Sequence, residues 1–329
     1  MSVSVVIPCY RSARALPALV ARLLPVLREV SVRHEVILVV DGCPDDTWRA
    51  ASDLAARFDV VRAIHLSRNY GQHNALVAGI REAAFDVVVT MDDDLQHPPE
   101  QIPLLLAALE GDRLDLVYGV PYKEEHGLVR NLASRWVKAA MAVALGVRTA
   151  RAISAFRAFR TRLRDGFQDL SGPHASLDVA LSWATTRVGS VKVRMSERGQ
   201  GRSAYTPRLL VRHAMNMLLG YSTTPLRVAS YLGFLVGVIG LLLGGAVLWS
   251  FLAGETTVAG FTTIASMVAL FSSAQLMSIG VLGEYVGRVH GSGMGRPAYV
   301  IRERAGAHVP ADLPYRPAAT KPYRPDGVN

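Results

Sequence analysis

The sequence predicts an α/β protein with a mostly parallel, doubly wound sheet in its N-terminal part and a membrane anchor behind it. Two observations predict this architecture. Short apolar runs alternate with amphipathic helical patterns over roughly the first 120 residues. Further along, residues 228–253 and 256–283 contain no charged side chain. Each of these stretches exceeds the roughly 20 residues that a helix needs to cross a bilayer.

The N-terminal strands are predicted from β-branched and apolar runs, and the helices from apolar residues at helical spacing. The predicted strands are residues 3–7, 36–40, 60–66, 87–90 and 114–119. After the first strand, apolar residues from Ala15 to Leu27 recur at three- and four-residue intervals, which indicates an amphipathic helix. The opening residues have no basic leader and are predicted to be a strand, not a signal peptide. Strands that alternate with helices favour parallel pairing.

Polar side chains follow four of these strands where each ends. They are Tyr10, Asp41, Arg68 with Asn69, and the run Asp92–Asp93–Asp94. Ligand sites of open α/β sheets lie at the carboxyl ends of the strands, so these residues are expected to converge on one edge. Each could also be an ordinary turn or surface residue. No glycine-rich loop of the Walker or dinucleotide type occurs, which disfavours a classical P-loop or Rossmann site.

Three adjacent carboxylates repel one another unless water or a cation offsets their charge. Oxygen ligands of this kind suit Mg²⁺ or Mn²⁺, which is usually shared with a substrate phosphate. In a strand-to-loop turn Asp92 and Asp94 can face one side while Asp93 faces away, so this pair is predicted to hold the metal. Gln96 could add a further oxygen ligand or hydrogen-bond to the ligands and hold them in place. The alternative is a solvated acidic turn that precedes the next helix.

Composition and charge distinguish between a membrane-associated protein, a nucleic-acid-binding protein and a disulfide-rich protein. The chain has 329 residues, 50% of them hydrophobic, with a formal net charge of +9. Two cysteines, Cys9 and Cys43, exclude a disulfide framework. The basic residues gather beside the apolar stretches, which favours a membrane surface over nucleic acid. Arginines flank the apolar pair, whereas no lysine or arginine separates its members, so both ends are expected on the cytoplasmic side of a multi-pass inner-membrane protein.

The sequence resembles the polyprenyl-phosphate glycosyltransferases of glycosyltransferase family 2, the dolichol-phosphate-mannose-synthase-like group, and among these most closely the bacterial undecaprenyl-phosphate aminoarabinose transferases. The motifs that carry the resemblance are VVIPCY, VDG, LSRNYGQHNALVAG, MDDDLQHPPEQIP, TTPLR, LGEYVGRV and RPAYV. The resemblance implies a GT-A catalytic domain that transfers a sugar from a nucleotide donor to a lipid phosphate on the cytoplasmic face. The expected domains are residues 1–205 (GT-A domain), 206–226 (interfacial helix), 227–287 (two-helix transmembrane hairpin) and 288–329 (cytoplasmic tail, partly disordered).

The resemblance, together with the loop positions, also yields a set of expected site residues. The expected nucleotide-binding residues are Pro8, Tyr10, Asp41, Arg68, Asn69, Asp92 and Asp93. The expected ligands of Mg²⁺ or Mn²⁺ are Asp92, Asp94 and Gln96. The expected catalytic residues are Asp92, Asp94, Arg157 and Arg198. The expected contacts to the acceptor phosphate are Lys123, Arg130, Ser134, Arg202 and Ser203.

Several alternatives remain at this point. The donor is expected to be a UDP-sugar, and the alternatives are a GDP-mannose-dependent polyprenyl-phosphate mannose synthase and a non-catalytic membrane-anchored binding protein of the same fold. A processive polysaccharide synthase is disfavoured because its Gln-x-x-Arg-Trp signature is absent. Small residues in the first apolar stretch could allow helices of a homo-oligomer to approach closely. These residues are Gly233, Gly237, Gly240 and Gly244.

Overall fold

The computed structural model describes residues 1–122, 153–167, 176–195, 224–254, 260–294 and 297–306. The strands in these ranges are β1 (Ser2–Cys9), β2 (Arg33–Val40), β3 (Val61–Leu66), β4 (Val87–Thr90), β5 (Leu116–Pro121), β6 (Arg157–Arg160), β7 (Val188–Val193) and β8 (Ile301–Ala305). They form one sheet in the order β7-β5-β6-β4-β1-β2-β3-β8. The helices are α1 (Leu16–Val30), α2 (Thr47–Arg57), α3 (Gln72–Glu82), α4 (Ile102–Gly111), α6 (Leu177–Ala184), α8 (Thr224–Leu252) and α9 (Phe261–Gly293), with short 3-10 turns η1 (Pro99–Gln101) and η3 (Thr161–Phe167).

The sheet is mostly parallel, as the sequence predicts. Strands β1 to β4 run in one direction, and β5 and β7 run with them. Strand β6 is antiparallel to both β4 and β5, and β8 is antiparallel to β3. The carboxyl ends of β1, β2, β3 and β4 therefore meet at the same edge, because these four strands are neighbours in the sheet.

The strand boundaries differ from the predicted ones at several ends. Strand β1 continues through Cys9, where a turn was predicted, because its pairing with β2 extends to Val40. Pro8 is tolerated there since pairing with β4 ends at Val6, so the missing amide hydrogen leaves no ladder bond unmade. Strand β5 lies two residues later than predicted because its parallel pairing with β7 runs on to Pro121.

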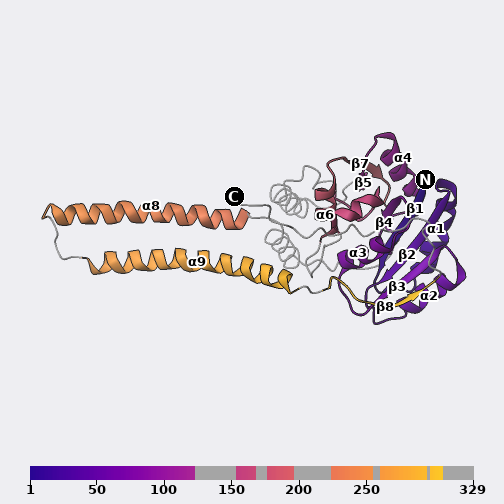
Figure 1. Cartoon of the computed structure of the whole chain (residues 1–329), viewed down its shortest axis with the longest axis horizontal. Helices are drawn as coiled ribbons and strands as arrows, with labels where there is room; N and C mark the ends of the chain where they lie inside the picture. The colour runs from indigo at the N-terminus through magenta and orange to yellow at the C-terminus, as the bar shows by residue number, and fades with distance from the viewer. Residues whose placement is uncertain (123–152, 168–175, 196–223, 255–259, 295–296, 307–329) are drawn as a thin grey trace, which may run out of the picture.

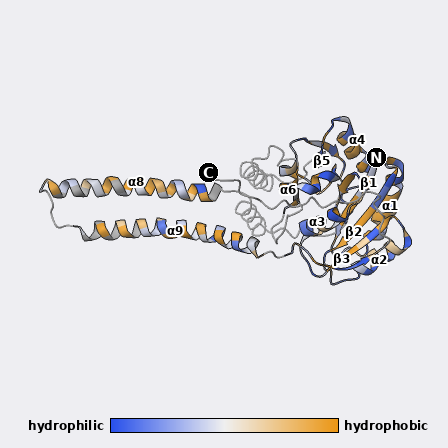
Figure 2. Ribbon diagram, in the orientation of Figure 1, coloured by the Kyte–Doolittle hydropathy of each residue, from blue (hydrophilic) through white to orange (hydrophobic). Residues whose placement is uncertain are grey.

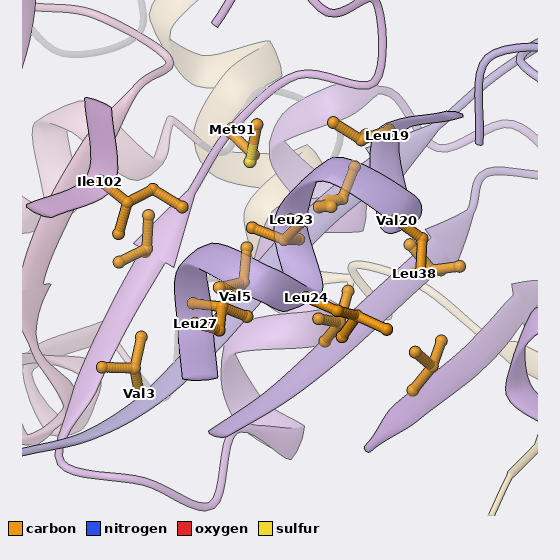
Figure 3. Packing of buried hydrophobic residues seen from close by; sticks show 14 of the residues in the cluster. Val3, Val5, Leu19, Val20, Leu23, Leu24, Leu27, Leu38, Met91 and Ile102 are labelled. Carbon is orange, nitrogen blue, oxygen red and sulfur yellow. The ribbon is translucent and has the colours of Figure 1, made fainter. Parts of the chain in front are cut away.

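Helices cover both faces of the sheet in a three-layer arrangement (Figure 1). On one face α1 buries a stripe of six apolar side chains, and Figure 3 shows Leu19, Leu23 and Leu27 of this stripe packed over Val5 and its neighbours. On the other face α3 and α6 pack over β-strand side chains such as Val6 and Ile64. Each fully buried aliphatic side chain contributes roughly 2 kcal/mol, so these two cores hold the strand ends in fixed relative positions.

A long helical pair extends away from the sheet domain (Figure 1), and Figure 2 shows hydrophobic residues along both of its helices. In α8, the segment Leu226–Ala246 is long and apolar enough to cross a membrane. Among the described residues no other helix meets these criteria, so the second predicted span stays a prediction. At Gly240 an added Cβ would lie 3.0 Å from the Phe271 ring, so this glycine allows α9 to approach α8.

Strand β8 is an element that sequence reasoning missed. It lies in the region predicted as a partly disordered tail, yet it joins the sheet beside β3. Its sequence IRERA carries charges at three of five positions and has no strong strand pattern. The predicted interfacial helix lies outside the described residues up to position 223, and α8 begins at Thr224, three residues before the predicted hairpin.

Candidate active site

The polar loops predicted from the sequence lie together at the carboxyl edge of the sheet. Tyr10 follows β1, Asp41 follows β2, the loop of residues 67–71 follows β3, and Asp92–Asp94 follow β4. Tyr10 is exposed, whereas Pro8 is buried inside β1. Hydrogen bonds between these loops, described below, tie the four strand ends into one site.

Asp41 organises the loop of residues 67–71. Its side chain is buried, and its two carboxylate oxygens accept hydrogen bonds from the backbone amides of Tyr70 (2.7 Å) and Gly71 (2.8 Å). Burial raises the pKa of Asp41, and these two hydrogen bonds oppose the rise. Arg68 lies over the Tyr70 ring at 4.7 Å, and Asn69 accepts a hydrogen bond from the Gly71 amide (3.0 Å). Arg68 and Asn69 are both exposed at the rim.

Gly42 allows this loop to approach β2. Its φ is +55°, and an added Cβ would lie 2.0 Å from the carbonyl carbon of Arg68. We expect Gly42→Ala to displace the loop and to lower the free energy of unfolding by about 2–4 kcal/mol, because a backbone atom cannot move aside as a side chain can. Thermal unfolding of the purified protein measures the loss. The control is Gly111→Ala, where a Cβ meets nothing within 4 Å; equal stabilities of the two variants would contradict the expectation.

Asp93 joins the β4 loop to the β1 loop. Its Oδ2 accepts a hydrogen bond from the Tyr10 amide (3.1 Å). Burial, together with the charges of Asp92 and Asp94, raises the pKa of Asp93 to about 6, and the hydrogen bond from the Tyr10 amide opposes the rise. In the structure Asp93 therefore supports the loop that carries Tyr10.

Asp92 and Asp94 have other partners. Asp92 Oδ1 accepts a hydrogen bond from Gln72 Nε2 (2.7 Å) at the start of α3. Asp94 accepts hydrogen bonds from the backbone amide of Gln96 (3.1 Å) and from its side-chain amide (2.7 Å). Gln96 thus lies beside Asp94, where it can orient that carboxylate or add a further oxygen ligand.

The described residues contain no cluster of three or more His, Cys, Asp or Glu side chains that could hold a metal ion. Mg²⁺ is usually bound through one or two carboxylates and the phosphates of a substrate. The oxygen-rich pair Asp92 and Asp94 at an exposed rim, with Gln96 beside Asp94, suits a divalent ion of that shared kind.

His97 is a residue of this loop whose role the sequence did not reveal. Its ring is buried and stacks on Phe156 with the ring centroids 5.3 Å apart. Its Nδ1 accepts a hydrogen bond from the backbone amide of Asp92 (3.4 Å). Burial, with a smaller contribution from the charge of Arg157, lowers the pKa of His97 to about 4, and the charge of Asp94 opposes this shift. The imidazole is therefore neutral near pH 7 and anchors the backbone of Asp92. The only sequence feature that could have pointed to this role is the position of the histidine in the run QHPPE, directly after the acidic residues.

Arg157 lies next to this loop because β6 pairs with β4, so that Arg157 is opposite Thr90. Its side chain is buried, and its Nε donates a hydrogen bond to Thr90 Oγ1 (3.1 Å). Its guanidinium forms an ion pair with Asp178 of α6, whose carboxylate also accepts a hydrogen bond from the Tyr118 hydroxyl (3.3 Å). Burial, followed by the charge of Asp178, raises the pKa of Tyr118.

Asp178 was missed by the sequence analysis. It is an acidic residue in the first turn of a short helix. Acidic residues are common at such positions because they favour the helix N-terminus, so the sequence gives no reason to single this one out. Six of the expected site residues lie outside the described part of the chain. They are Lys123, Arg130, Ser134, Arg198, Arg202 and Ser203.

An α/β sheet with aspartates at its carboxyl rim, coupled through β6 to a buried arginine, is the arrangement expected of a glycosyltransferase of the GT-A fold. The chain belongs to glycosyl transferase family 2, whose model matches residues 4–170. It is 33% identical over 313 residues to undecaprenyl-phosphate 4-deoxy-4-formamido-L-arabinose transferase of Pectobacterium carotovorum subsp. carotovorum (strain PC1), covering 94% of this chain and 95% of that protein. The enzyme of the same name from Proteus mirabilis (strain HI4320) is 32% identical over 311 residues, covering 94% and 95%.

Solved structures confirm the fold. Glucosyl-3-phosphoglycerate synthase from Mycobacterium tuberculosis, in complex with Mn²⁺ and uridine-diphosphate-glucose, superposes with a TM-score of 0.51 at 18% identity, covering 67% of this chain and 79% of that one. The same enzyme with Mn²⁺, uridine-diphosphate and glucosyl-3-phosphoglycerate gives a TM-score of 0.51 at 20% identity, covering 67% and 80%. The GT-A prediction for the N-terminal part of the chain is therefore confirmed.

Proposed function

We propose that this glycosyltransferase moves a sugar from a UDP-sugar to undecaprenyl phosphate on the cytoplasmic face of the inner membrane. The observation that carries the proposal is the match to undecaprenyl-phosphate transferases over 94% of the chain, which takes in the sheet domain and the helical hairpin together. The uridine nucleotide is the donor expected from the resemblance. The relatives' names make 4-deoxy-4-formamido-L-arabinose the first sugar to test.

The reaction is a single displacement at the anomeric carbon. An oxygen of the lipid phosphate forms the new bond, the bond from the sugar to the nucleoside diphosphate breaks, and the configuration inverts. The acceptor phosphate is already anionic near neutral pH, so positioning and charge neutralisation replace a strong base. A divalent ion, Mg²⁺ or Mn²⁺, held by Asp92, Asp94 and Gln96, would offset the charge of the donor diphosphate.

The chain's own residues divide the remaining tasks. Tyr10 and the Asp41-ordered loop with Arg68 and Asn69 receive the nucleoside, and Asp93 holds the Tyr10 loop in place. Arg157 supplies positive charge beside the β4 loop. For the acceptor phosphate we propose the cationic and hydroxyl residues beyond β5 and β7. These are Lys123, Arg130, Ser134, Arg198, Arg202 and Ser203.

The hairpin keeps the site at the bilayer surface. We propose that both α8 and α9 cross the membrane, with the sheet domain in the cytoplasm. Two observations support this topology. The segment after α9 joins the sheet through β8, so the chain returns to the domain that precedes α8. The sequence between the apolar stretches has no lysine or arginine, whereas arginines flank the pair.

Incubation of the purified full chain with undecaprenyl phosphate, Mg²⁺ or Mn²⁺ and a panel of nucleotide sugars tests the proposal. We expect mass spectrometry to detect a glycolipid with a UDP-sugar, and NMR to show an inverted anomeric centre. Undecaprenol, which lacks the phosphate, is the control acceptor and should give no product. A product from GDP-mannose alone would favour the mannose synthase alternative, and no glycolipid from any donor would contradict the proposal.

A further inference from the structure

The chain that leaves the membrane hairpin contacts the loop expected to bind the donor nucleotide. We infer that this return segment, defined as residues 297–306, is a positioning element of the donor site, and that it fixes the β3–α3 loop of residues 67–71. The inference rests on the proposed function, because the proposed function places the donor nucleotide at this loop.

The first contact lies at the beginning of the loop. Strand β8 pairs with β3 from Ala63 to Leu66, with an irregularity between His65 and Leu66. Immediately beyond this irregularity the Ser67 amide donates a hydrogen bond to the carbonyl oxygen of Val300 (2.9 Å). The loop therefore leaves the sheet from a residue whose backbone is bonded to the return segment.

The second set of contacts lies at the far end of α3, the helix that follows the loop. Arg81 lies over the Tyr299 ring at 5.5 Å, and Arg304 forms an ion pair with Glu82 (2.9 Å). Glu82 also pairs with the buried Arg62 of β3 (3.0 Å). Burial alone would raise the pKa of Glu82, but the interactions with Arg304 and Arg62 lower it. The return segment thus holds the strand before the loop and the helix after it.

The loop has two supports of different origin. Asp41 and Gly42 hold it from the end of β2, within the N-terminal part of the chain. Ser67 holds it through the return segment, which the chain adds only after α8 and α9. Consequently the conformation of the donor loop is fully fixed only when the return segment, which follows the hairpin in the sequence, has joined the sheet. Nucleotide affinity should therefore depend on β8.

Gly306 offers a way to detach the segment. Its φ is +89°, and an added Cβ would lie 2.6 Å from the Val61 carbonyl oxygen. We expect Gly306→Val in the full chain to speed amide exchange of residues 67–71 by about tenfold or more, with exchange of residues 92–97 unchanged. The matched control is Gly254→Val, at a glycine with φ +73° and nothing within 4 Å of the added Cβ. Rapid exchange of β8 with unaltered exchange at residues 67–71 would overturn the inference.

Arg304 gives a second variant that is less disruptive, because its side chain is largely exposed. Arg304→Ala should raise the KM for the nucleotide sugar by about threefold, with kcat and the KM for the lipid phosphate unchanged, and Arg304→Lys should restore part of the loss. The control is Arg162→Ala, which breaks a similarly exposed ion pair with Asp115 (2.7 Å). Equal changes in both substrates' KM would overturn a role at the donor loop.

The two readouts keep this inference separate from the proposed function. If wild-type protein makes no glycolipid while Gly306→Val still loosens residues 67–71, the assigned reaction is wrong and the structural link stands. If wild-type protein makes the glycolipid, while Gly306→Val leaves exchange at residues 67–71 unchanged and Arg304→Ala leaves the KM for the nucleotide sugar unchanged, the reaction stands and the inference is wrong.

Discussion

Replacement of Asp94 by alanine should lower the rate of glycolipid formation by about a thousandfold, with the protein still folded and inserted in the membrane. Because Asp94 is exposed, its removal should cost little stability, whereas the donor diphosphate loses one of the two carboxylates that would hold its divalent ion. Turnover, thermal unfolding and the Mn²⁺ concentration for half-maximal rate measure the three parts of this expectation.

Asp94 is a sharper test than Asp92, because Asp92 also bonds to Gln72 and lies beside His97. A defect in an Asp92 variant could come from a displaced loop. The control for Asp94→Ala is Asp112→Asn, which neutralises an exposed carboxylate at the end of α4 and should change none of the three measurements. Wild-type turnover of Asp94→Ala would remove the metal assignment, and with it the proposed role of Gln96.

The sequence predicted the features that local patterns determine. Strands β1 to β4 follow from apolar runs next to helical periodicity, and parallel strands place Tyr10, Asp41 and Asp92 at one edge whatever the details of packing. Boundaries were less predictable because they depend on the partner strand. Strand β5 ends at Pro121 since β7 continues beside it, and β7 lies some 70 residues away in the sequence.

The missed residues depend on contacts across the sheet. His97 supports Asp92 only because Phe156 of a distant segment lies under its ring. Asp178 faces Arg157 because β6 inserts between β4 and β5, an antiparallel placement that no sequence period reveals. Strand β8 is recognisable only once the hairpin returns the chain to β3. In each case a pair of residues far apart in the sequence defines the feature.

Arg157→Met should lower the free energy of unfolding by about 2–4 kcal/mol, because it leaves the carboxylate of Asp178 facing the interior without its ionic partner. The side chains of Arg157 and Asp178 are 2% and 13% exposed. The partial exposure of Asp178 makes this loss smaller than the roughly 3–5 kcal/mol expected when a fully buried pair is broken. Arg162→Met is the control, since Arg162 is 67% exposed and surface pairs contribute about 0–1 kcal/mol.

The double variant Arg157→Met/Asp178→Asn separates the structural role of Arg157 from its proposed role in the reaction. It leaves no unpaired ion in the interior, and the asparagine oxygen can still accept the hydrogen bond of the Tyr118 hydroxyl, so stability should recover to within about 1 kcal/mol of the wild type. If the role of Arg157 is purely structural, turnover should recover together with stability. If Arg157 neutralises phosphate charge in the reaction, turnover stays low despite the restored stability, because methionine supplies no positive charge beside Thr90 and the β4 loop. Recovery of both quantities would assign Arg157 to the scaffold alone.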